Sequence, residues 1–300
     1  MAAQRPKGRS ASPGKLHPGN TLNDLTGSEW VHSTKSWFVC DGRRTALDRG
    51  VEAHPASFPP ELAERYIRLF TKQGATVLDP FVGSGSTLVA CAATGRRGIG
   101  VELVAEYVET CRRRLGDACG LFGGGDQQIV HGDGRDLATL VRTPVDLCLT
   151  SPPYWDMLHH SRGGVASAHR RRAAQGLDTQ YSSDERDLGN IAAYEAYLDA
   201  VEGVFRQVAE LLQLGGYVVV VAQNVRVRTG TMVPVAWDLA RRLSRFLLLQ
   251  QEQVWCQDQK PLGCWGYPTT YVSNVHHHYC LVLQKPGGTR RRDHSEGDSP

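Results

Sequence analysis

Short apolar runs alternate with segments of helical periodicity along the middle of the chain. In the first helical segment, the apolar side chains of Leu62, Tyr66, Ile67 and Phe70 recur at the spacing of one helix face. The short runs, such as 145–149, end near glycine, proline or acidic residues, which is typical of buried strands. This alternation of strands and helices favours an α/β protein with a largely parallel sheet.

The same pattern sets the expected order of the elements. The apolar stretch from Trp30 to Arg44 is expected to form a short strand or a cover on the core. Gly215-Gly216 is expected to cap a helix, and a loose glycine-rich loop is expected at 116–127. Predicted helices span 60–74, 88–94, 105–115, 191–214 and 235–247. Predicted strands span 75–81, 97–101, 128–130, 145–149, 217–222 and 249–257, with a last pair of the sheet at 270–274 and 279–284.

Segments without apolar periodicity flank and interrupt this pattern. Residues 1–25 and 287–300 are polar and are expected to be disordered tails of a single domain at 26–286. The basic stretch 156–190 is long for a loop, which predicts either a mobile loop over the site or disorder alone. Four of its side chains are candidate contacts to a DNA backbone: Arg162, Arg170, Arg171 and Arg172.

The composition is that of a soluble globular protein, with 41% hydrophobic and 22% charged residues. A formal net charge of +3 permits a polyanionic partner without requiring one. No apolar run approaches the roughly 18 residues that span a bilayer, and the first residues lack the apolar core of a signal peptide. The eight cysteines form no CxxC pair, which favours reduced thiols and a cytoplasmic location.

Three consecutive histidines, His276-His277-His278, raise the question of a metal site. Alternation along a strand would place His276 and His278 on one face. Apart from Cys280, however, no carboxylate or thiolate stands at ligand spacing. No metal is therefore expected.

A glycine-rich turn joins the strand at 75–81 to the helix at 88–94. Asp79 lies near the end of that strand, and Gly83-Ser84-Gly85 allows a ligand to approach the backbone and the free N–H groups of the helix. Leu88 stands where a dinucleotide fingerprint has its third glycine, and no phosphate-loop lysine is present. Both phosphate-binding interpretations are weakened for this reason.

Acidic side chains also follow the next two strands. Glu102 closes the strand at 97–101, where a carboxylate can bind both ribose hydroxyls; a surface glutamate at a helix start is the alternative. Asp133 comes after the strand at 128–130 and is a candidate acceptor for an adenine amino group. Asp136 is expected to cap the following helix.

A proline-rich aromatic turn, Thr150-Ser151-Pro152-Pro153-Tyr154-Trp155, follows the strand at 145–149. The two prolines end the strand and stiffen the backbone. A hydroxyl, backbone carbonyls and two aromatic rings are thereby presented at the end of a strand, where open α/β sheets bind ligands. The turn suits a flat molecule carrying an NH2 group, although aromatic packing alone is an alternative.

With these segments in order, the chain resembles the S-adenosylmethionine-dependent amino DNA methyltransferases over most of its length. Asp79–Thr87 is similar to the cofactor motif of that family, and Thr150–Trp155 is similar to its catalytic motif. His54–Pro59 and His278–Pro286 resemble its first segment and its closing strand. The resemblance implies a Rossmann-like fold: a mostly parallel seven-stranded sheet with an antiparallel last strand and helices on both faces. Unlike typical members, the chain has no evident separate target-recognition domain.

The resemblance also implies the roles of individual residues. S-adenosylmethionine is the implied cofactor, with its ribose at Glu102 and its adenine at Asp133. Catalysis is assigned to Ser151, Pro152, Pro153 and Tyr154. Further cofactor contacts are implied for His54, Phe58, Asp79, Pro80, Phe81, Gly83, Ser84, Gly85, Thr87 and Leu103.

In the implied reaction, the Ser151 hydroxyl and the Pro152 carbonyl accept hydrogen bonds from an exocyclic amine. The base is flipped out of the duplex, and Tyr154 and Trp155 stack on it. A motif that begins with serine is associated in the family with cytosine N4, whereas aspartate or asparagine usually marks adenine N6. Ser151 therefore predicts N4-cytosine methylation of DNA.

Several alternatives stay open at this point. Serine can also accept from the amine of adenine, and an RNA base or a protein glutamine presents a similar planar NH2 group. A nucleic-acid-binding module without catalysis is a further alternative. DNA is the expected partner, with a cognate restriction endonuclease as a second candidate, no membrane contact, and either a monomer or a homodimer.

Overall fold

An eight-stranded sheet organises the part of the chain that the computed structural model describes, which is residues 14–41, 58–123, 126–155, 184–227, 230–260, 262–265 and 267–287. In spatial order the strands are β1 (Trp37–Val39), β9 (Leu248–Cys256), β12 (His277–Gln284), β6 (Leu212–Ala222), β5 (Val145–Thr150), β2 (Thr76–Asp79), β3 (Arg97–Glu102) and β4 (Gln127–His131). β12 is antiparallel to both of its neighbours, and every other neighbouring pair in this sheet is parallel. The expected mostly parallel sheet with an antiparallel last strand is confirmed.

The described sheet has one strand more than expected, because β1 pairs in parallel with the end of β9. Phe38 of β1 lies against the Tyr66 ring of the helix at Pro60–Phe70, with ring centroids 6.2 Å apart. Part of the stretch from Trp30 to Arg44 is therefore a strand, one of its two expected outcomes. A short helix precedes it, α1 (Gly27–Ser33), and begins with a capping box formed by Thr26 and Glu29.

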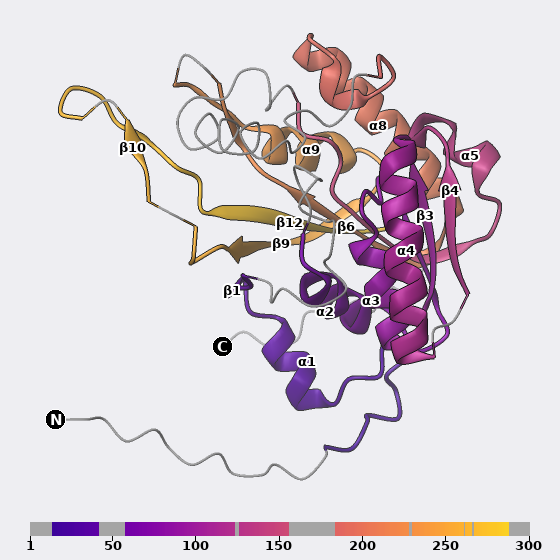
Figure 1. Cartoon of the computed structure of the whole chain (residues 1–300). Coiled ribbons are helices and arrows are strands. Elements are labelled where there is room, and N and C mark those ends of the chain that lie inside the picture. The colour runs from indigo at the N-terminus through magenta and orange to yellow at the C-terminus, as the bar shows by residue number, and fades with distance from the viewer. Residues whose placement is uncertain are drawn as a thin grey trace, which may run out of the picture.

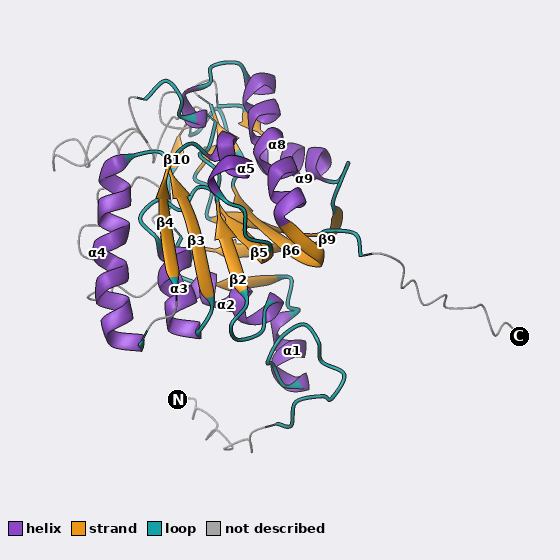
Figure 2. Cartoon of the chain, turned by 90° about the vertical axis from the view of Figure 1, so that its right-hand side faces the viewer, coloured by secondary structure: helices purple, strands orange, loops and turns teal. Residues whose placement is uncertain are grey.

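Helices cover both faces of the sheet, as Figure 2 shows. One face carries α2 (Pro60–Phe70), α3 (Ser86–Thr94) and α4 (Ala105–Phe122), and the other carries α5 (Leu137–Leu140), α8 (Tyr194–Leu211) and α9 (Val235–Leu243). In β6, Val219 and Val221 pack in the core with α2, while Val218 and Val220 pack in the core with α8. Burial on both faces explains the unbroken run of valines. Within the described ranges, no helix is both long and apolar enough to cross a membrane.

The helix α4 extends well beyond its predicted end. A loop was expected at 116–127, but the residues up to Phe122 are helical, and Gly116 and Gly120 lie inside the helix. The prediction is therefore wrong for 116–122. Ala118 between them is buried against Val89 of α3, and this contact outweighs the low helix propensity of glycine. Gly123 ends the helix with a φ of 70°.

Gly215 and Gly216 do not cap a helix, contrary to the prediction. α8 ends at Leu211 and β6 begins at the next residue, so both glycines lie within the strand. The register between β5 and β6 shifts there, and Gly215 has a φ of 78°. A Cβ at Gly216 would lie 2.9 Å from the Asp146 carbonyl. The pair therefore marks an irregularity in a crowded strand rather than a helix end.

Two small hairpins extend from the sheet near the ends of β6 and β9. The first pairs β7 (Val225–Arg226) with β8 (Met232–Val233), and the second pairs β10 (Cys264–Trp265) with β11 (Val272–Ser273). Figure 1 shows the second hairpin projecting beyond β9 and β12. The segment 270–274, expected to end the main sheet, lies in this separate hairpin, so that prediction is wrong.

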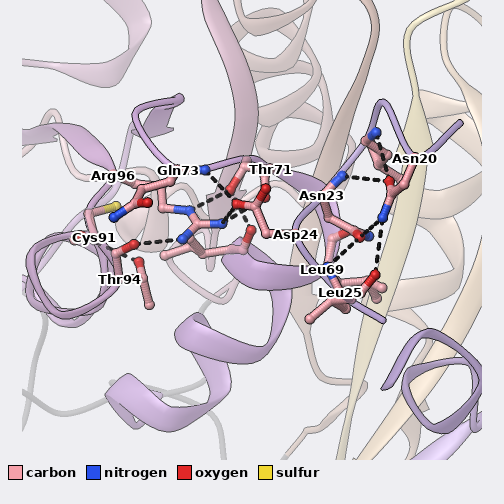
Figure 3. Close-up of polar contacts among 12 residues, drawn as sticks. Asn20, Asn23, Asp24, Leu25, Leu69, Thr71, Gln73, Cys91, Thr94 and Arg96 are labelled. Atoms are coloured by element: carbon pink, nitrogen blue, oxygen red, sulfur yellow. Dashed lines mark hydrogen bonds and ion pairs between the residues drawn. The ribbon is translucent and has the colours of Figure 1, made fainter. Parts of the chain in front are cut away.

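The N-terminal segment is attached to the domain by polar contacts (Figure 3). Asn23 donates to the Leu69 carbonyl at 2.7 Å, and Asp24 accepts from the Gln73 N–H at 2.8 Å. Asp24 also pairs at 3.4 Å with Arg96, whose side chain is only 5% exposed. Residues 14–25 are therefore held against the domain, and the disordered tail expected to reach residue 25 is wrong for them.

Candidate cofactor cavity and catalytic turn

The loop after β2 is shaped by glycines with left-handed backbone. Gly83 has a φ of 53°, and Gly85, with a φ of 90°, stands at the start of α3. A Cβ at Gly85 would overlap the sulfur of Cys111 in α4. Gly85 is therefore required for packing between helices, whereas Gly83 and Ser84 line a cavity. The sequence grouped these residues as one cofactor loop, but the structure separates them.

Asp79 lies beneath this loop and is 1% exposed. Its two carboxylate oxygens accept hydrogen bonds at 2.6 Å from Thr87 of α3 and from Thr150 of β5, and the Phe81 N–H donates to it at 3.1 Å. Burial raises the pKa of Asp79 to about 6 despite these bonds. Asp79 and Thr87 are not among the residues that line the cavity, so they join β2, α3 and β5 beneath it.

The cavity opens at the carboxyl ends of β2, β3 and β5, where the acidic strand ends were expected to meet. Residues of six separate segments form its walls. They are Phe58; Pro80 to Ser84 with Ser86; Val101 to Val104 with Tyr107; Asp133 and Gly134; Ser151 to Pro153; and Arg186 to Leu188. The loops after β2, β3 and β4 therefore share one cavity with the proline-rich turn.

Glu102 is fixed in this cavity by the backbone. One carboxylate oxygen accepts from the Gly83 N–H at 2.9 Å, and the other accepts from the Val104 N–H at 2.8 Å. Burial raises the pKa of Glu102 to about 7, with smaller increases from the charges of Asp187 and Asp79. Each oxygen retains a further lone pair for a ligand hydroxyl.

Asp133 lines the cavity but is engaged by its own segment. Its carboxylate accepts from the Arg135 guanidinium at 2.6 and 3.1 Å and from the Arg135 backbone N–H. Burial acts to raise the pKa of Asp133, but the hydrogen bonds from Arg135 outweigh this effect. The net pKa of Asp133 is therefore below its usual value. Asp133 thereby caps the short 3-10 helix η3 (Gly134–Asp136). Asp136 occupies the predicted N-cap position of α5, but its side chain makes no capping hydrogen bond there.

A wall of the cavity comes from a segment that the sequence did not assign. Asp187 is 5% exposed, and its carboxylate accepts from the Gly189 N–H at 2.9 Å at the start of the 3-10 helix η4 (Leu188–Asn190). Arg135 donates to the Arg186 carbonyl at 3.1 Å, which links this segment to the loop after β4. The Asp-x-Gly pattern before a helix was an available signal, but it lay inside the predicted mobile loop.

The catalytic turn lies at the other side of the same cavity. Ser151, Pro152 and Pro153 line it, and the Ser151 hydroxyl lies 3.2 Å from the Tyr154 hydroxyl. Tyr197 of α8 donates to the Pro153 carbonyl at 2.9 Å, which fixes the second proline. A serine hydroxyl and a stiff carbonyl thus line the same cavity as the glycine loop.

The two aromatic residues of the turn point into the domain. Tyr154 is 4% exposed and is not among the lining residues. Its ring lies 6.2 Å from that of His278, which stacks on Trp255 at 4.6 Å. Trp155 is partly buried beside Tyr194, at 4.8 Å between centroids. Their stacking on a base therefore stays a prediction.

Some predicted site residues lie outside the described ranges. They are His54 and the loop arginines Arg162, Arg170, Arg171 and Arg172. Phe58, near the end of the segment His54–Pro59 that resembles the first segment of the family, lines the cavity and is 7% exposed. In the described part of the chain, no cluster of three or more metal-ligating side chains occurs.

The first third of the chain matches a known protein family. Residues 11–113, which contain the glycine loop and Glu102, match the family described as DNA methylase. This match shows that the segment 11–113 is similar to that family. The match ends before Ser151, so it carries no information on the target amine.

Two curated relatives are methyltransferases. The orphan methyltransferase M.BamHII of Bacillus amyloliquefaciens is 39% identical over 80 residues, which cover 26% of this chain and 30% of the relative. The type II methyltransferase M.BglI of Bacillus subtilis is 35% identical over 103 residues, covering 33% of this chain and 28% of the relative. The matched part thus spans less than a third of each relative. Among solved structures, TrmN from Thermus thermophilus aligns over 81% of this chain and 54% of its own, with 19% identity and a TM-score of 0.48.

The cavity has the chemistry that S-adenosylmethionine, the donor implied by the resemblance, requires. Glu102 and Asp187 place two buried carboxylates beside it, which suits a ligand with hydroxyls and positive charge. They disfavour a pyrophosphate, because Arg186 is the single basic residue among the lining residues and is paired with Asp184. The residues present therefore fit this donor.

Proposed function

We propose that this protein methylates an exocyclic amine of a base in DNA, with S-adenosylmethionine as the methyl donor. One observation carries the proposal: the proline-rich turn at Ser151 and the acidic loop ends at Glu102 and Asp187 line a single cavity. A donor bound over β2 and β3 would therefore lie directly beside the turn that receives the amine.

The protein would hold the donor through its fixed polar groups. Glu102 accepts from the ribose hydroxyls, and Asp133 is the candidate partner of the adenine. The backbone around Gly83 and the ring of Phe81 also line the cavity and would hold the remaining, methionine end. When bound, S-adenosylmethionine supplies a methyl group on a positively charged sulfur, ready for direct displacement by a nitrogen.

Ser151 and Pro152 would orient the amine. An aryl NH2 is a weak nucleophile because its lone pair is delocalised into the ring. Hydrogen bonds from the amine to the Ser151 hydroxyl and the Pro152 carbonyl favour a more tetrahedral nitrogen with its lone pair directed into the cavity. Positioning and electrostatics then supply the acceleration, with no covalent enzyme intermediate.

The proposed target is cytosine N4 in DNA, on the basis of Ser151 at the head of the motif. The base is expected to leave the duplex to reach the cavity. A partnering restriction endonuclease stays a prediction, and so does the choice between monomer and homodimer.

Incubation with isotopically labelled cofactor and unmethylated DNA tests the proposal, followed by mass spectrometry of the nucleosides. Label in N4-methylcytosine is the expected result. Label in N6-methyladenine would retain the enzyme class and overturn the role given to Ser151 in base choice. Label in RNA or in a protein glutamine, but not in DNA, would overturn the proposed substrate.

A further inference from the structure

The edge of the sheet that holds the cavity has two different halves. The carboxyl ends of β2, β3 and β4 lie on one side of the Ser151 turn and end in the loops that line the cavity. On the other side are the ends of β6 and β9, which run in the same direction because both are antiparallel to β12. The β7–β8 hairpin follows β6, and the β10–β11 hairpin joins β9 to β12. Both hairpins therefore start from the same edge as Ser151.

The two hairpins lie next to each other and are fixed at their bases. A Cβ built at Gly230 would lie 3.4 Å from a methyl group of Val272, so the two hairpins come close together at this point. The side chain of Gln223 donates to the His277 carbonyl at 2.8 Å, and that of Lys260 donates to the Val275 carbonyl at 2.8 Å. Together they form one projecting surface, here called the hairpin arm (residues 223–227, 230–234, 262–265 and 267–275).

The surface of the hairpin arm exposes large apolar and aromatic side chains and carries no acid. Tyr267 is 87% exposed, Tyr271 is 83% exposed and Leu262 is 92% exposed. The sequence from 262 to 275 contains no charged side chain, and the residues from 223 to 234 contain arginine but no acid. Exposed aromatic rings gathered on one projection indicate a binding surface.

We propose that the hairpin arm binds the DNA strand next to the target base, with Tyr267 and Tyr271 stacking on unpaired bases. This inference rests on the proposed function and assigns its substrate-binding surface. Nucleic acid fits because aromatic rings stack on bases of any sequence, and the absence of carboxylates avoids repulsion of phosphates. The position of the hairpin arm also supports this assignment, because the arm and the donor cavity lie on opposite sides of Ser151 along the sheet edge.

The test compares Tyr267→Ala/Tyr271→Ala with the wild-type chain. Binding of a fluorescein-labelled DNA is measured by anisotropy, and binding of S-adenosylhomocysteine is measured by calorimetry. We expect DNA affinity to fall by about tenfold or more for each tyrosine and cofactor affinity to be unchanged. Tyr267→Phe/Tyr271→Phe keeps both rings and should bind DNA as the wild type does.

Phe122→Ala is the matched control, because Phe122 is a 50% exposed aromatic residue at the far end of α4. It should leave DNA affinity unchanged. If the wild type methylates DNA and the double alanine variant binds it equally well, the hairpin arm is not the DNA surface, while the proposed function stands. If the wild type neither binds nor methylates DNA, the proposed function and this inference both fail. A change in sedimentation coefficient with unchanged DNA affinity would show that the arm binds a second copy of the chain instead.

Discussion

The sheet edge that holds Ser151 has a donor half, which lines the cofactor cavity, and an arm half, which carries the hairpin arm. The two halves differ in how exposed their characteristic side chains are. In the donor half, Asp79, Glu102 and Asp187 are almost fully buried, and hydrogen bonds from backbone or side chains fix their carboxylates. In the arm half, Tyr267 and Tyr271 are almost fully exposed. A cavity for a small, constant ligand gains from preorganisation, whereas a long and variable strand needs accessible faces. Ser151 stands where the two halves meet, and variants can separate their contributions.

The largest effect is expected at that meeting point. Ser151→Ala removes the hydroxyl that accepts from the amine, and turnover should fall by about 100- to 1,000-fold, as for other electrostatic positioning groups. Cofactor affinity by calorimetry should be unchanged, because Ser151 belongs to the base side of the reaction. Wild-type turnover in this variant would mean that the amine is oriented by other groups.

The donor half should show a dependence of stability on pH. Burial raises the pKa of Glu102 from 4.5 to about 7, so folding favours its protonated form. The stability that this preference contributes is complete below about pH 4.5 and is lost as the pH rises through 7. Relative to Glu102→Gln, the wild type should lose up to about 3 kcal/mol of unfolding free energy between pH 4.5 and pH 8.

Urea unfolding of both proteins across this pH range measures the difference. The pH dependence from Asp79 is present in both proteins, so the comparison removes it apart from its smaller coupling to Glu102. Glu109→Gln is a suitable control, because Glu109 is 72% exposed on α4. A constant difference between wild type and Glu102→Gln would show that Glu102 ionises as freely in the fold as in the unfolded chain.

Ligand binding in the donor half should also depend on Glu102. Glu102→Ala removes two acceptor oxygens and is expected to weaken binding of S-adenosylhomocysteine by about tenfold or more. DNA binding by the hairpin arm should be unaffected, which shows in the same sample that the variant is folded. Equal cofactor affinity in calorimetry would contradict the ribose assignment.

A smaller effect is expected from the hydroxyl of Tyr154. It lies 3.2 Å from the Ser151 hydroxyl and can accept a hydrogen bond from it, which leaves the serine lone pairs available to accept from the amine. Tyr154→Phe should lower kcat by about threefold to tenfold without changing the KM for the cofactor. The effect should vanish in a Ser151→Ala background, because the two hydroxyls act together. A loss of equal size in both backgrounds would indicate a packing role alone.

The sequence predicted the donor half better than the arm. Glu102, Asp133 and Ser151, which line one cavity, were candidates because each stands at or just after the end of a strand, and parallel strands bring their ends to one edge. Asp187 was missed because its place depends on a long connection, and the arm depends on contact between two distant hairpins. Two predictions based on glycine were wrong: the loop at 116–127 as far as Phe122, and the helix cap at Gly215-Gly216. In both places packing within the fold outweighed the local preference of glycine for loops and helix ends.

The strand β1 has a consequence for the order in which the chain becomes structured during its synthesis. Ser33 accepts a hydrogen bond from Gln253, a separation of 220 residues, and Trp255 donates to the Cys40 carbonyl at 2.6 Å. At ribosomal speeds, β1 leaves the tunnel about 10–40 s before its partner strand. During that interval Phe38 has a contact available on α2, where Arg65 lies 4.5 Å from its ring centroid. The strand β1 can therefore pair within the sheet only after β9 has emerged, although it is made more than 200 residues earlier.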